Sequence, residues 1–361
     1  MQGFTDHRTN ESISALIGRS TVSCILVIFT QFTLSLVPRF FYASSLLLQL
    51  SLSALLLLLV LGFGRWCKRL LGVYSSASAL VFYNIIFLWC VYFIFVRQAT
   101  SRLIDVMFQV EVAMLLVGLR SILSSDPGFV NTGSLQTDSE IKPFEVEAQN
   151  EFGSLGLKRI RYCKSCKAYV KGFDHHCPAF GNCIGQNNHV LFIVLLLGFL
   201  CTEATYIMCS FQFVRASHVL NGTKFEIGLA GSLVISTLLF ALLQVLWQGI
   251  FMAWHVYCIC FNIKTDEWKR KRKKKKESLA AAGHEGTLGV TTLPVSPSFI
   301  SHLLLEDRIG INWKKYPEFQ ITIESQPVFC NPGGSFTIMR YTNPYDKGII
   351  QNVKEFSTRR D

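Results

Sequence analysis

The sequence predicts an all-α polytopic membrane protein with about six transmembrane helices and a small Cys-rich module between two of them. Half of its 361 residues are hydrophobic and only 16% are charged, and the mean hydropathy is +0.35. A soluble domain of this length is rarely so apolar. Four apolar segments are each long enough to cross a hydrocarbon core about 30 Å thick. They occupy residues 43–63, 79–96, 190–214 and 228–254.

Two further segments bring the expected number of spans to six. Residues 22–41 and residues 103–123 are also apolar, but both contain polar or charged side chains. A charge in the middle of a membrane is costly, so such residues normally face a helix-bundle interior or a wet cavity. For Asp105 and Glu111 two alternatives stay open, namely a functional role and simple partners inside the bundle.

The basic residues predict the orientation of the chain in the membrane. With six spans, residues 64–78, residues 124–189 and both termini lie on one side. That side also carries Lys269–Lys276, eight consecutive cations in a chain of net charge +11. Because Lys and Arg concentrate in cytosolic loops, we expect this side to be the cytosol. Spans of about 20 residues suit the Golgi, the endoplasmic reticulum or the plasma membrane alike.

The chain is expected to have five parts in order. The Cys-rich part is too short to bury a core of its own, so another device must stabilise it. The five parts are an N-terminal segment with a helical hairpin (1–78), a second pair of spans (79–123), the cytosolic Cys-rich domain (124–189), the last pair of spans (190–261) and a cytosolic tail with a polybasic run and a linker (262–361).

The Cys-rich part contains metal-ligand spacing. Cys163 and Cys166 form a CxxC pair, His176 follows ten positions after the second cysteine, and Cys183 follows seven positions later. Three thiolates and one imidazole make a closed tetrahedral zinc site, which supplies folding energy to a loop without a core. Cytosolic thiols stay reduced, so metal binding, catalysis or lipid attachment is expected here rather than a disulfide. These four residues therefore predict one structural zinc ion.

That assignment leaves Asp174, His175 and Cys177 beside the metal ligands. The nucleophile of a cysteine is its thiolate, and a neighbouring imidazole can take the proton while a carboxylate fixes the imidazole's tautomer. A zinc ion on His176 and Cys183 would hold the backbone rigid, so that the imidazole and the thiol stay within reach. The spacing alone leaves two alternatives open, in which every cysteine is a ligand or Cys177 is a spare buried thiol.

Four motifs occur in the order in which one enzyme family has them. The motifs are Asp126-Pro127-Gly128; Asp174-His175-His176-Cys177-Pro178 with Asn182-Cys183-Ile184-Gly185, Asn188 and Phe192; Thr265-Asp266-Glu267, with Lys264 in place of the first Thr of TTxE; and Asn343-Pro344-Tyr345-Asp346-Lys347-Gly348 with Asn352 and Phe356. In these motifs the chain resembles the DHHC family of integral-membrane protein S-acyltransferases, from about residue 79 to the end. The first 75 residues are extra to the minimal four-span family.

The resemblance implies a two-step transfer of a long-chain acyl group, typically palmitoyl, from acyl-CoA to cysteines of cytosolic-face proteins. Cys177 would be the nucleophile and carry the S-acyl intermediate, His175 would be the general base, and Asp174 would orient it. The CoA phosphates need cations, although a merely solvated basic face is the alternative for each one. The cations nearest in sequence are Lys158, Arg159, Arg161, Lys164, Lys167 and Lys171.

The chain departs from the family at two places. Family members usually have a second zinc site, but Tyr162 and Tyr169 stand where the family has His and Cys, and no earlier CxxC exists in the cytosolic stretch. We therefore predict one zinc ion per chain. The usual Trp after the DHHC-Pro is Ala179, followed by Phe180, so the preferred acyl length stays open.

The tail carries two further expectations. The run Lys269–Lys276 is expected to bind anionic lipid headgroups, at about 1 kcal/mol per cation near a charged surface. Nothing beyond charge points to nucleic acid. By resemblance, Asn343, Tyr345 and Asn352 are expected to dock the tail against the spans.

Two other function classes compete with the enzyme. One is a catalytically silent membrane adaptor that uses the zinc loop and the basic tail to bind partners. The other is a transporter using Asp105, Glu111 and Glu203 in its spans, and it ranks last because broken-helix and repeat signals are missing.

Overall fold

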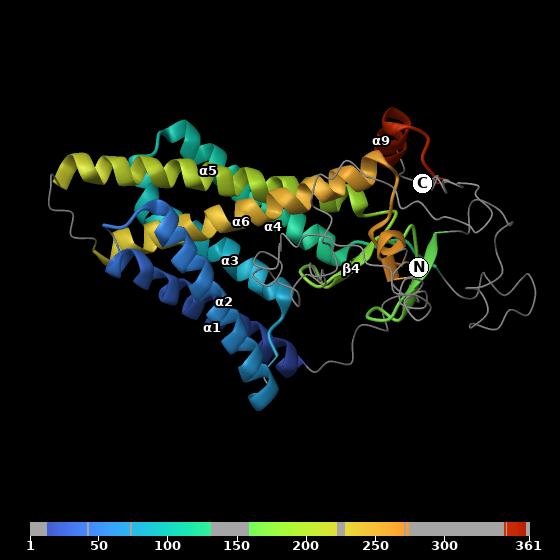
Figure 1. Ribbon diagram of the computed structural model, residues 1–361, viewed down its shortest axis with the longest axis horizontal. Coiled ribbons are helices and arrows are strands. Elements are labelled where there is room, and N and C mark those ends of the chain that lie inside the picture. The colour runs from blue at the N-terminus through green and yellow to red at the C-terminus, as the bar shows by residue number, and fades with distance from the viewer. Residues whose placement is uncertain are drawn as a thin grey trace, which may run out of the picture. The chain divides into compact units, whose positions relative to one another are not determined.

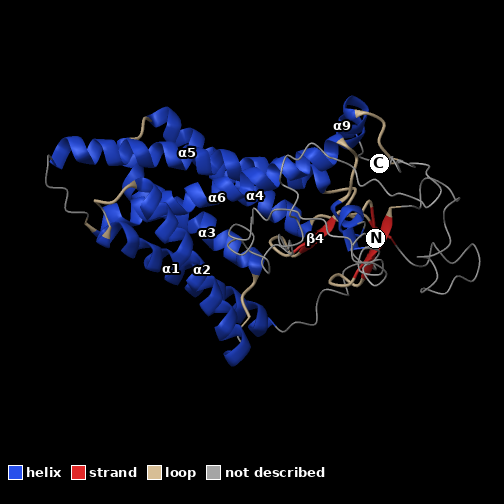
Figure 2. Ribbon diagram, viewed as in Figure 1, coloured by secondary structure: helices blue, strands red, loops and turns tan. Residues whose placement is uncertain are grey.

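The computed structural model describes residues 13–41, 43–72, 74–130, 159–221, 228–270, 272–273, 343 and 345–358 (Figure 1). Most of this chain is helical, with a few short strands (Figure 2). Six helices in the described residues are long and apolar enough to cross a membrane, which confirms the predicted all-α polytopic fold. The six membrane-crossing lengths are Ser14–Phe40, Leu46–Trp66, Ala77–Ala99, Arg102–Ser124, His189–Ala216 and Leu229–Cys260.

The chain divides into two compact units. The first comprises residues 1–124, 178–181 and 191–252, and the second comprises residues 125–177, 182–190 and 253–361.

The N-terminal half of the first unit contains four helices. The serines at residues 45 and 76 cap the second and third helices by accepting a backbone N–H, as expected of good N-cap residues. A π-helical turn, Tyr92–Val96, and a short 3-10 turn, Arg97–Ala99, extend the third helix. The helices are α1 (Ile13–Phe40), α2 (Leu46–Leu71), α3 (Ala77–Val91) and α4 (Arg102–Ser124).

The span predicted at 22–41 begins earlier in the structure, since α1 starts at Ile13. Hydropathy locates the apolar part that crosses a membrane, whereas a helix continues as long as its backbone hydrogen bonds do. The preceding polar turns are therefore missed by an apolar window.

The charged side chains of the spans have partners inside the first unit. Arg97 Nε lies 2.9 Å from Asp105 Oδ2, Thr205 Oγ1 donates to Glu111 Oε1 at 3.1 Å, and the Gln248 amide donates to Glu203 Oε1 at 2.8 Å. These contacts favour the structural alternative for the three carboxylates. None of the three contacts favours transport.

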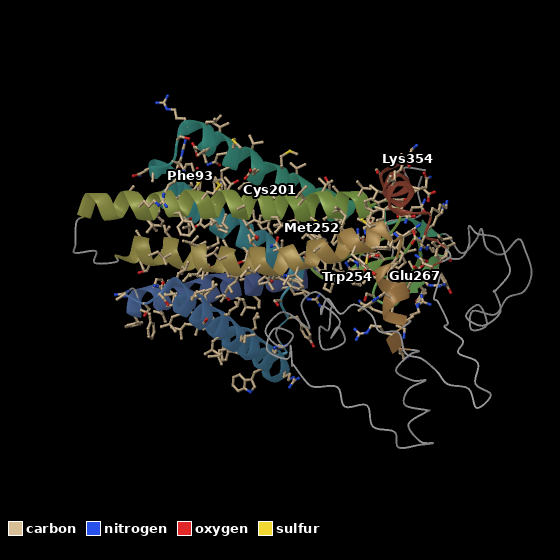
Figure 3. The ribbon with its side chains drawn as sticks, turned by 45° about the horizontal axis from the view of Figure 1, so that its top comes forward. Phe93, Cys201, Met252, Trp254, Glu267 and Lys354 are labelled. Carbon is tan, nitrogen blue, oxygen red and sulfur yellow. The ribbon has the colours of Figure 1, made fainter. Side chains whose placement is uncertain are left out.

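The last two helices, α5 (His189–Asn221) and α6 (Leu229–Cys260), run alongside each other (Figures 1 and 3). Within the first unit Phe192 of α5 packs edge-on against Phe251 of α6, with ring centroids 6.2 Å apart. Phe180, which stands near the DHHC stretch in the sequence, also packs edge-on against Phe192, with ring centroids 6.0 Å apart.

The second unit contains two small antiparallel sheets. One has the strand order β1-β3-β2, built from Phe129–Val130, Ala168–Lys171 and Ile160–Cys163. The other pairs β4 (His175–Cys177) with β5 (Asn182–Ile184). Among the described residues these strands share few buried side chains, which agrees with the expectation that a module this short needs a further device to hold it.

The Asp-Pro-Gly motif anchors the start of this module. Asp126 Oδ1 accepts the backbone N–H groups of Gly128 and Phe129, at 2.8 and 2.9 Å, and so forms the turn that leads into β1. The carbonyl of Pro127 approaches Gly185 so closely that a Cβ there would lie 2.2 Å from the oxygen. Glycine is required at this position because no side chain fits.

Asn188 links the other end of the module to the same turn region. Its amide donates to Ser125 Oγ and to the Cys183 carbonyl, at 3.0 and 2.9 Å, and its oxygen accepts the Gly185 N–H. Every polar group of the side chain is used, so Asn188 fixes the backbone that follows β5.

The described part of the tail ends in helix α9 (Ile349–Thr358). Asn352 Nδ2 donates to the Cys260 carbonyl at 2.8 Å, and Asn343 Nδ2 donates to the Phe261 carbonyl at 2.6 Å. The Tyr345 carbonyl accepts from Asn262 at 2.8 Å. The tail is therefore held on the end of α6 through hydrogen bonds to backbone groups that the helix leaves unpaired.

Candidate active site and metal centre

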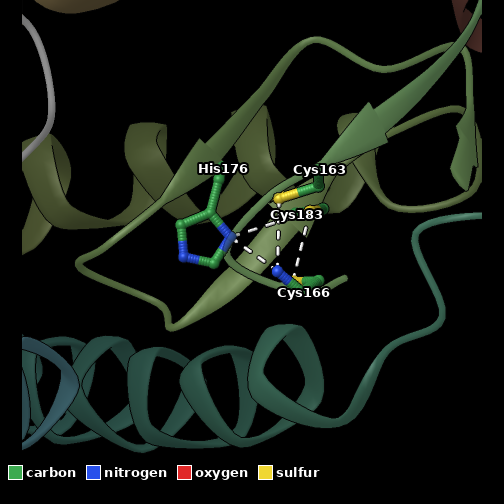
Figure 4. A group of neighbouring side chains, drawn as sticks. All are labelled: Cys163, Cys166, His176 and Cys183. Atoms are coloured by element: carbon green, nitrogen blue, oxygen red, sulfur yellow. Dashed lines mark hydrogen bonds between the residues drawn. The ribbon is translucent and has the colours of Figure 1, made fainter. Parts of the chain in front are cut away.

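Three cysteines and one histidine come together in the second unit (Figure 4). The ligand atoms of Cys163, Cys166, His176 and Cys183 all lie within 4.8 Å of one another. His176 Nδ1 is 3.4 Å from Cys166 Sγ and 3.7 Å from Cys183 Sγ, and these two sulfurs are 3.4 Å apart. Tetrahedral zinc, with Zn–S near 2.3 Å and Zn–N near 2.0 Å, needs donors at about this mutual spacing. The four residues fit a zinc ion.

The pairing of β4 with β5 explains how one short stretch serves two purposes. His176 lies opposite Cys183 in the ladder, and successive side chains of a strand point to opposite faces. His176 therefore faces the metal cluster, whereas His175 and Cys177 point to the other side. Among the described residues the four-ligand cluster does not include Cys177. The strand itself separates the metal ligand from its two neighbours.

Asp174 is fully buried and its carboxylate accepts three hydrogen bonds. His175 Nδ1 and Thr265 Oγ1 donate to Oδ2 at 2.8 and 2.9 Å, and the Thr265 backbone N–H donates to Oδ1 at 2.9 Å. Burial alone would raise the pKa of this carboxyl, but the hydrogen bond from His175 and the electrostatic interactions with the surrounding histidines together outweigh it, and the pKa stays well below its usual range. Asp174 is thus a buried carboxylate that orients the His175 ring.

The environment of His175 favours its protonated form. Burial lowers the pKa of the ring, but the hydrogen bond to Asp174 and the interaction with Cys177 raise it more strongly, to about 9. Cys177 itself is buried, with 2% of its surface exposed. Carboxylate, imidazole and thiol thus occur in series, with the imidazole able to hold a proton between the other two.

Three basic side chains surround this series, namely Lys264 of the TTxE-like motif and two histidines that the sequence interpretation did not single out, His189 and His255. The rings of His175 and His255 are 5.8 Å apart, those of His189 and His255 are 6.3 Å apart, and Lys264 Nζ lies 3.2 Å from His189 Nδ1. All are buried. The sequence signal that could have identified the two histidines is an ionisable residue at the end of an apolar span, because such a residue is costly there and is usually functional.

His189 and His255 also form a ligand-like group with Asp174, their donor atoms lying within 4.8 Å. However, the Asp174 oxygens already accept three hydrogen bonds, and the Lys264 amine lies against His189. A cationic side chain in contact with a would-be ligand opposes a metal ion. We interpret this group as a polar support for Asp174.

An aromatic pair stands at two positions of the family's second zinc site. Tyr162 and Tyr169 are directly opposite each other in the β2–β3 ladder, with ring centroids 5.2 Å apart. Such cross-strand aromatic pairs contribute about 0.5–1.5 kcal/mol. At these two positions an aromatic contact occupies the place where the family has metal ligands.

Arg159 is not available for CoA in the way the sequence predicts. Its guanidinium donates to both Glu267 carboxylate oxygens and to the side chain and carbonyl of Asn262, at 2.7–3.1 Å, and it lies 3.8 Å from the Tyr345 ring centroid. Glu267 belongs to the TTxE-like motif, Tyr345 belongs to the C-terminal motif and Asn262 follows the last span, so all three partners lie about a hundred or more residues away in the chain. Arg159 therefore joins the Cys-rich module to the tail, and we leave it out of the proposed phosphate contacts.

The other expected cations differ in their accessibility. Arg161 is partly buried near Asp266, at 3.9 Å, while Lys164, Lys167 and Lys171 are exposed. Lys158 lies outside the described residues. In the run Lys269–Lys276, Arg270 pairs with Asp266 and Arg272 lies over the Trp268 ring. Lys271 and residues 274–276 of this run lie outside the described part of the chain. Pro344 of the C-terminal motif also lies outside it.

We expect Arg159→Met to lower the free energy of unfolding by about 2 kcal/mol, because it leaves Glu267 and Asn262 without their donor. Thermal unfolding in detergent, followed by size-exclusion recovery, measures this. Arg161→Met is the matched control and should change stability by less than about 0.5 kcal/mol. Equal losses from the two variants would contradict the structural role.

The DHHC palmitoyltransferase family model matches residues 154–272. Curated relatives include Probable protein S-acyltransferase 1 of Arabidopsis thaliana, 26% identical over 188 residues (43% of this chain, 54% of the relative). Palmitoyltransferase ZDHHC3 of Rattus norvegicus is 26% identical over 207 residues (53% of this chain, 69% of the relative). The chain therefore spans between about half and two thirds of the length of these relatives. The matched segment contains the metal cluster, strand β4 and the Thr265 contact to Asp174, and in this segment the chain is similar to the DHHC palmitoyltransferase family.

Proposed function

We propose that the protein is a membrane S-acyltransferase that moves a long-chain acyl group, palmitoyl in the first instance, from acyl-CoA to cysteine thiols of cytosolic-face proteins. The observation that carries this proposal is the alternation along β4. It directs His176 to the metal cluster and leaves His175 and Cys177 on the opposite face, with Asp174 behind the imidazole. An adaptor protein would have no need of a buried carboxylate–imidazole–thiol series.

In the first step His175 accepts the Cys177 proton at Nε2, because Nδ1 carries the hydrogen that is bonded to Asp174. The sulfur attacks the thioester carbonyl carbon of acyl-CoA. A new C–S bond forms to Cys177, the C–S bond to CoA breaks, and the departing CoA thiolate takes the proton from the imidazolium. The acidic partner Asp174 stabilises the imidazolium throughout.

In the second step the thiol of the protein substrate loses its proton to His175 and attacks the acyl carbon on Cys177. The C–S bond to Cys177 breaks, and its sulfur regains a proton from the imidazolium. Burial of Asp174 and of the His175 ring excludes water from the proton path, which strengthens their interaction. The enzyme returns to its starting state.

One zinc ion is proposed for each chain, held by Cys163, Cys166, His176 and Cys183. When bound, it supplies structural stabilisation only, because four protein ligands leave no open position on a tetrahedral ion. By holding β4 and β5 together it keeps His175 and Cys177 in their relative positions.

The exposed cations Lys164, Lys167 and Lys171, with Lys158 and Arg161, are proposed to meet the CoA phosphates. The run Lys269–Lys276 is proposed to meet anionic lipid headgroups. We place both termini and the DHHC module on the cytosolic side of the Golgi, endoplasmic reticulum or plasma membrane. Nucleic acid is not among the proposed partners.

The direct test uses purified full-length protein and labelled palmitoyl-CoA. We expect one hydroxylamine-sensitive adduct, and peptide mapping by mass spectrometry should place it on Cys177. An adduct on another cysteine, or none on zinc-loaded protein, would favour the adaptor instead.

Thr265→Val should slow formation of the acyl-enzyme about tenfold, since it removes one of two Thr265 hydrogen bonds to the Asp174 charge. Single-turnover labelling measures the rate. Thr265→Ser keeps the hydroxyl and should restore the rate to within about twofold of the wild type. An unchanged rate in the valine variant, with unchanged zinc content, would show that Asp174 does not need this support.

A further inference from the structure

Helix α9 has an exposed apolar side. Ile350 is 87% exposed, Ile349 is 53% exposed and Val353 is 41% exposed, and these three side chains lie on neighbouring positions of one helical surface. The adjacent surface is covered by protein, because Asn352 is only 3% exposed and Phe356 packs edge-on against His189 at 5.0 Å. The helix therefore presents one apolar surface to the protein and a second to its surroundings.

The attachment of α9 fixes its level along the last span. Asn352 donates to the carbonyl of Cys260, the last residue of the membrane-crossing length of α6, and Asn343 donates to the carbonyl of the next residue, Phe261. These two bonds hold the helix at the last residues of the apolar, membrane-crossing length of α6. The exposed side chains of Ile349 and Ile350 therefore lie at the level of the end of α6.

An aromatic cluster marks the same level as the membrane–water interface. Trp254 stacks on Tyr257 at 5.7 Å and meets Trp268 at 4.8 Å, while Tyr257 meets Phe261 at 4.7 Å (Trp254 is labelled in Figure 3). Trp and Tyr concentrate at membrane–water interfaces, where an apolar ring body meets a polar tip. The carbonyls that anchor α9 belong to this aromatic stretch of the chain.

We propose that α9 is an interfacial helix, which inserts Ile349, Ile350 and Val353 into the headgroup–acyl boundary of the membrane at which the last span ends. The exposed apolar face of α9 contacts the lipid surface, because the attachment to Cys260 places this short helix beside the bilayer. The polar side of the helix, which includes the exposed Gln351, faces water. The proposed membrane contact of α9 does not depend on the proposed acyl transfer.

The test places an environment-sensitive fluorescent amino acid at position 350, and in a matched control at position 351 on the polar side, by stop-codon suppression, so that the native cysteines stay untouched. Full-length protein is reconstituted into phosphatidylcholine vesicles. Lipids with a spin label near the top of the acyl chain should quench position 350 at least about threefold more strongly than position 351. Aqueous iodide should give the opposite order.

A second variant keeps the probe at position 350 and adds Ile349→Ser and Val353→Ser. It should lose most of the lipid quenching while keeping the elution volume and unfolding midpoint of the parent. Equal iodide quenching at both positions would overturn the proposal, because the helix would then lie in water. Shielding of position 350 from both quenchers would also overturn it, since a protein segment would then cover the face.

Discussion

Cys177→Ser is expected to abolish covalent acyl labelling, by at least about 100-fold, while the protein stays folded and keeps its zinc ion. Asp174, His175 and Cys177 act together, so removing the nucleophile eliminates nearly all of the catalysis that they provide. The metal is unaffected because Cys177 points away from the four ligands, on the other face of β4. Gel fluorescence after incubation with a clickable palmitoyl-CoA analogue measures the labelling, and elemental analysis of the same sample measures the zinc.

The matched control for this prediction is Cys201→Ser. Cys201 is an exposed cysteine of α5 (Figure 3), and its removal should leave labelling unchanged. Two results would oppose the acyl-enzyme. One is full labelling of the Cys177 variant, and the other is loss of zinc from it, which would make Cys177 a ligand.

His176→Ala is expected to lose metal and the folded DHHC module together. Structural zinc contributes about 10 kcal/mol of apparent binding energy at neutral pH, more than the small core of this module can replace. Wild-type protein should contain one zinc ion per chain by plasma mass spectrometry. The variant should contain less than about a tenth of that, with a lowered unfolding midpoint and faster proteolysis within residues 159–190.

Chelation of the wild-type protein should produce the same change, and restoring zinc should reverse it. His175→Ala provides the contrast, because the adjacent ring faces the other side of the strand and its loss should leave the metal bound. Two zinc ions per chain would contradict the assignment of a single site. Retention of zinc by the His176 variant would contradict the ligand set itself.

The sequence by itself determines the membrane architecture and the composition of the metal cluster. Twenty-residue apolar runs can only be spans, because every backbone polar group in lipid must be paired within the segment. Similarly, a CxxC pair followed by His176 and Cys183 is enough to assign four donors, because zinc accepts this ligand set and few other structures require it. The order of the four motifs also indicated the resemblance to the DHHC family. The residues of these motifs have no explanation from local pattern alone.

Only the tertiary structure decided which distant groups the polar side chains of the module contact. Spacing and resemblance already assigned His176 to the metal and His175 to Cys177, and the extended strand β4 supplies the physical reason, because successive side chains of a strand point to opposite faces. Sequence proximity likewise assigned Arg159 to CoA, whereas its actual partners, Glu267 and Asn262, are distant in the chain. These assignments depend on which distant backbone segments meet, and that is fixed by long-range packing and hydrogen bonding, to which no local pattern of residues responds.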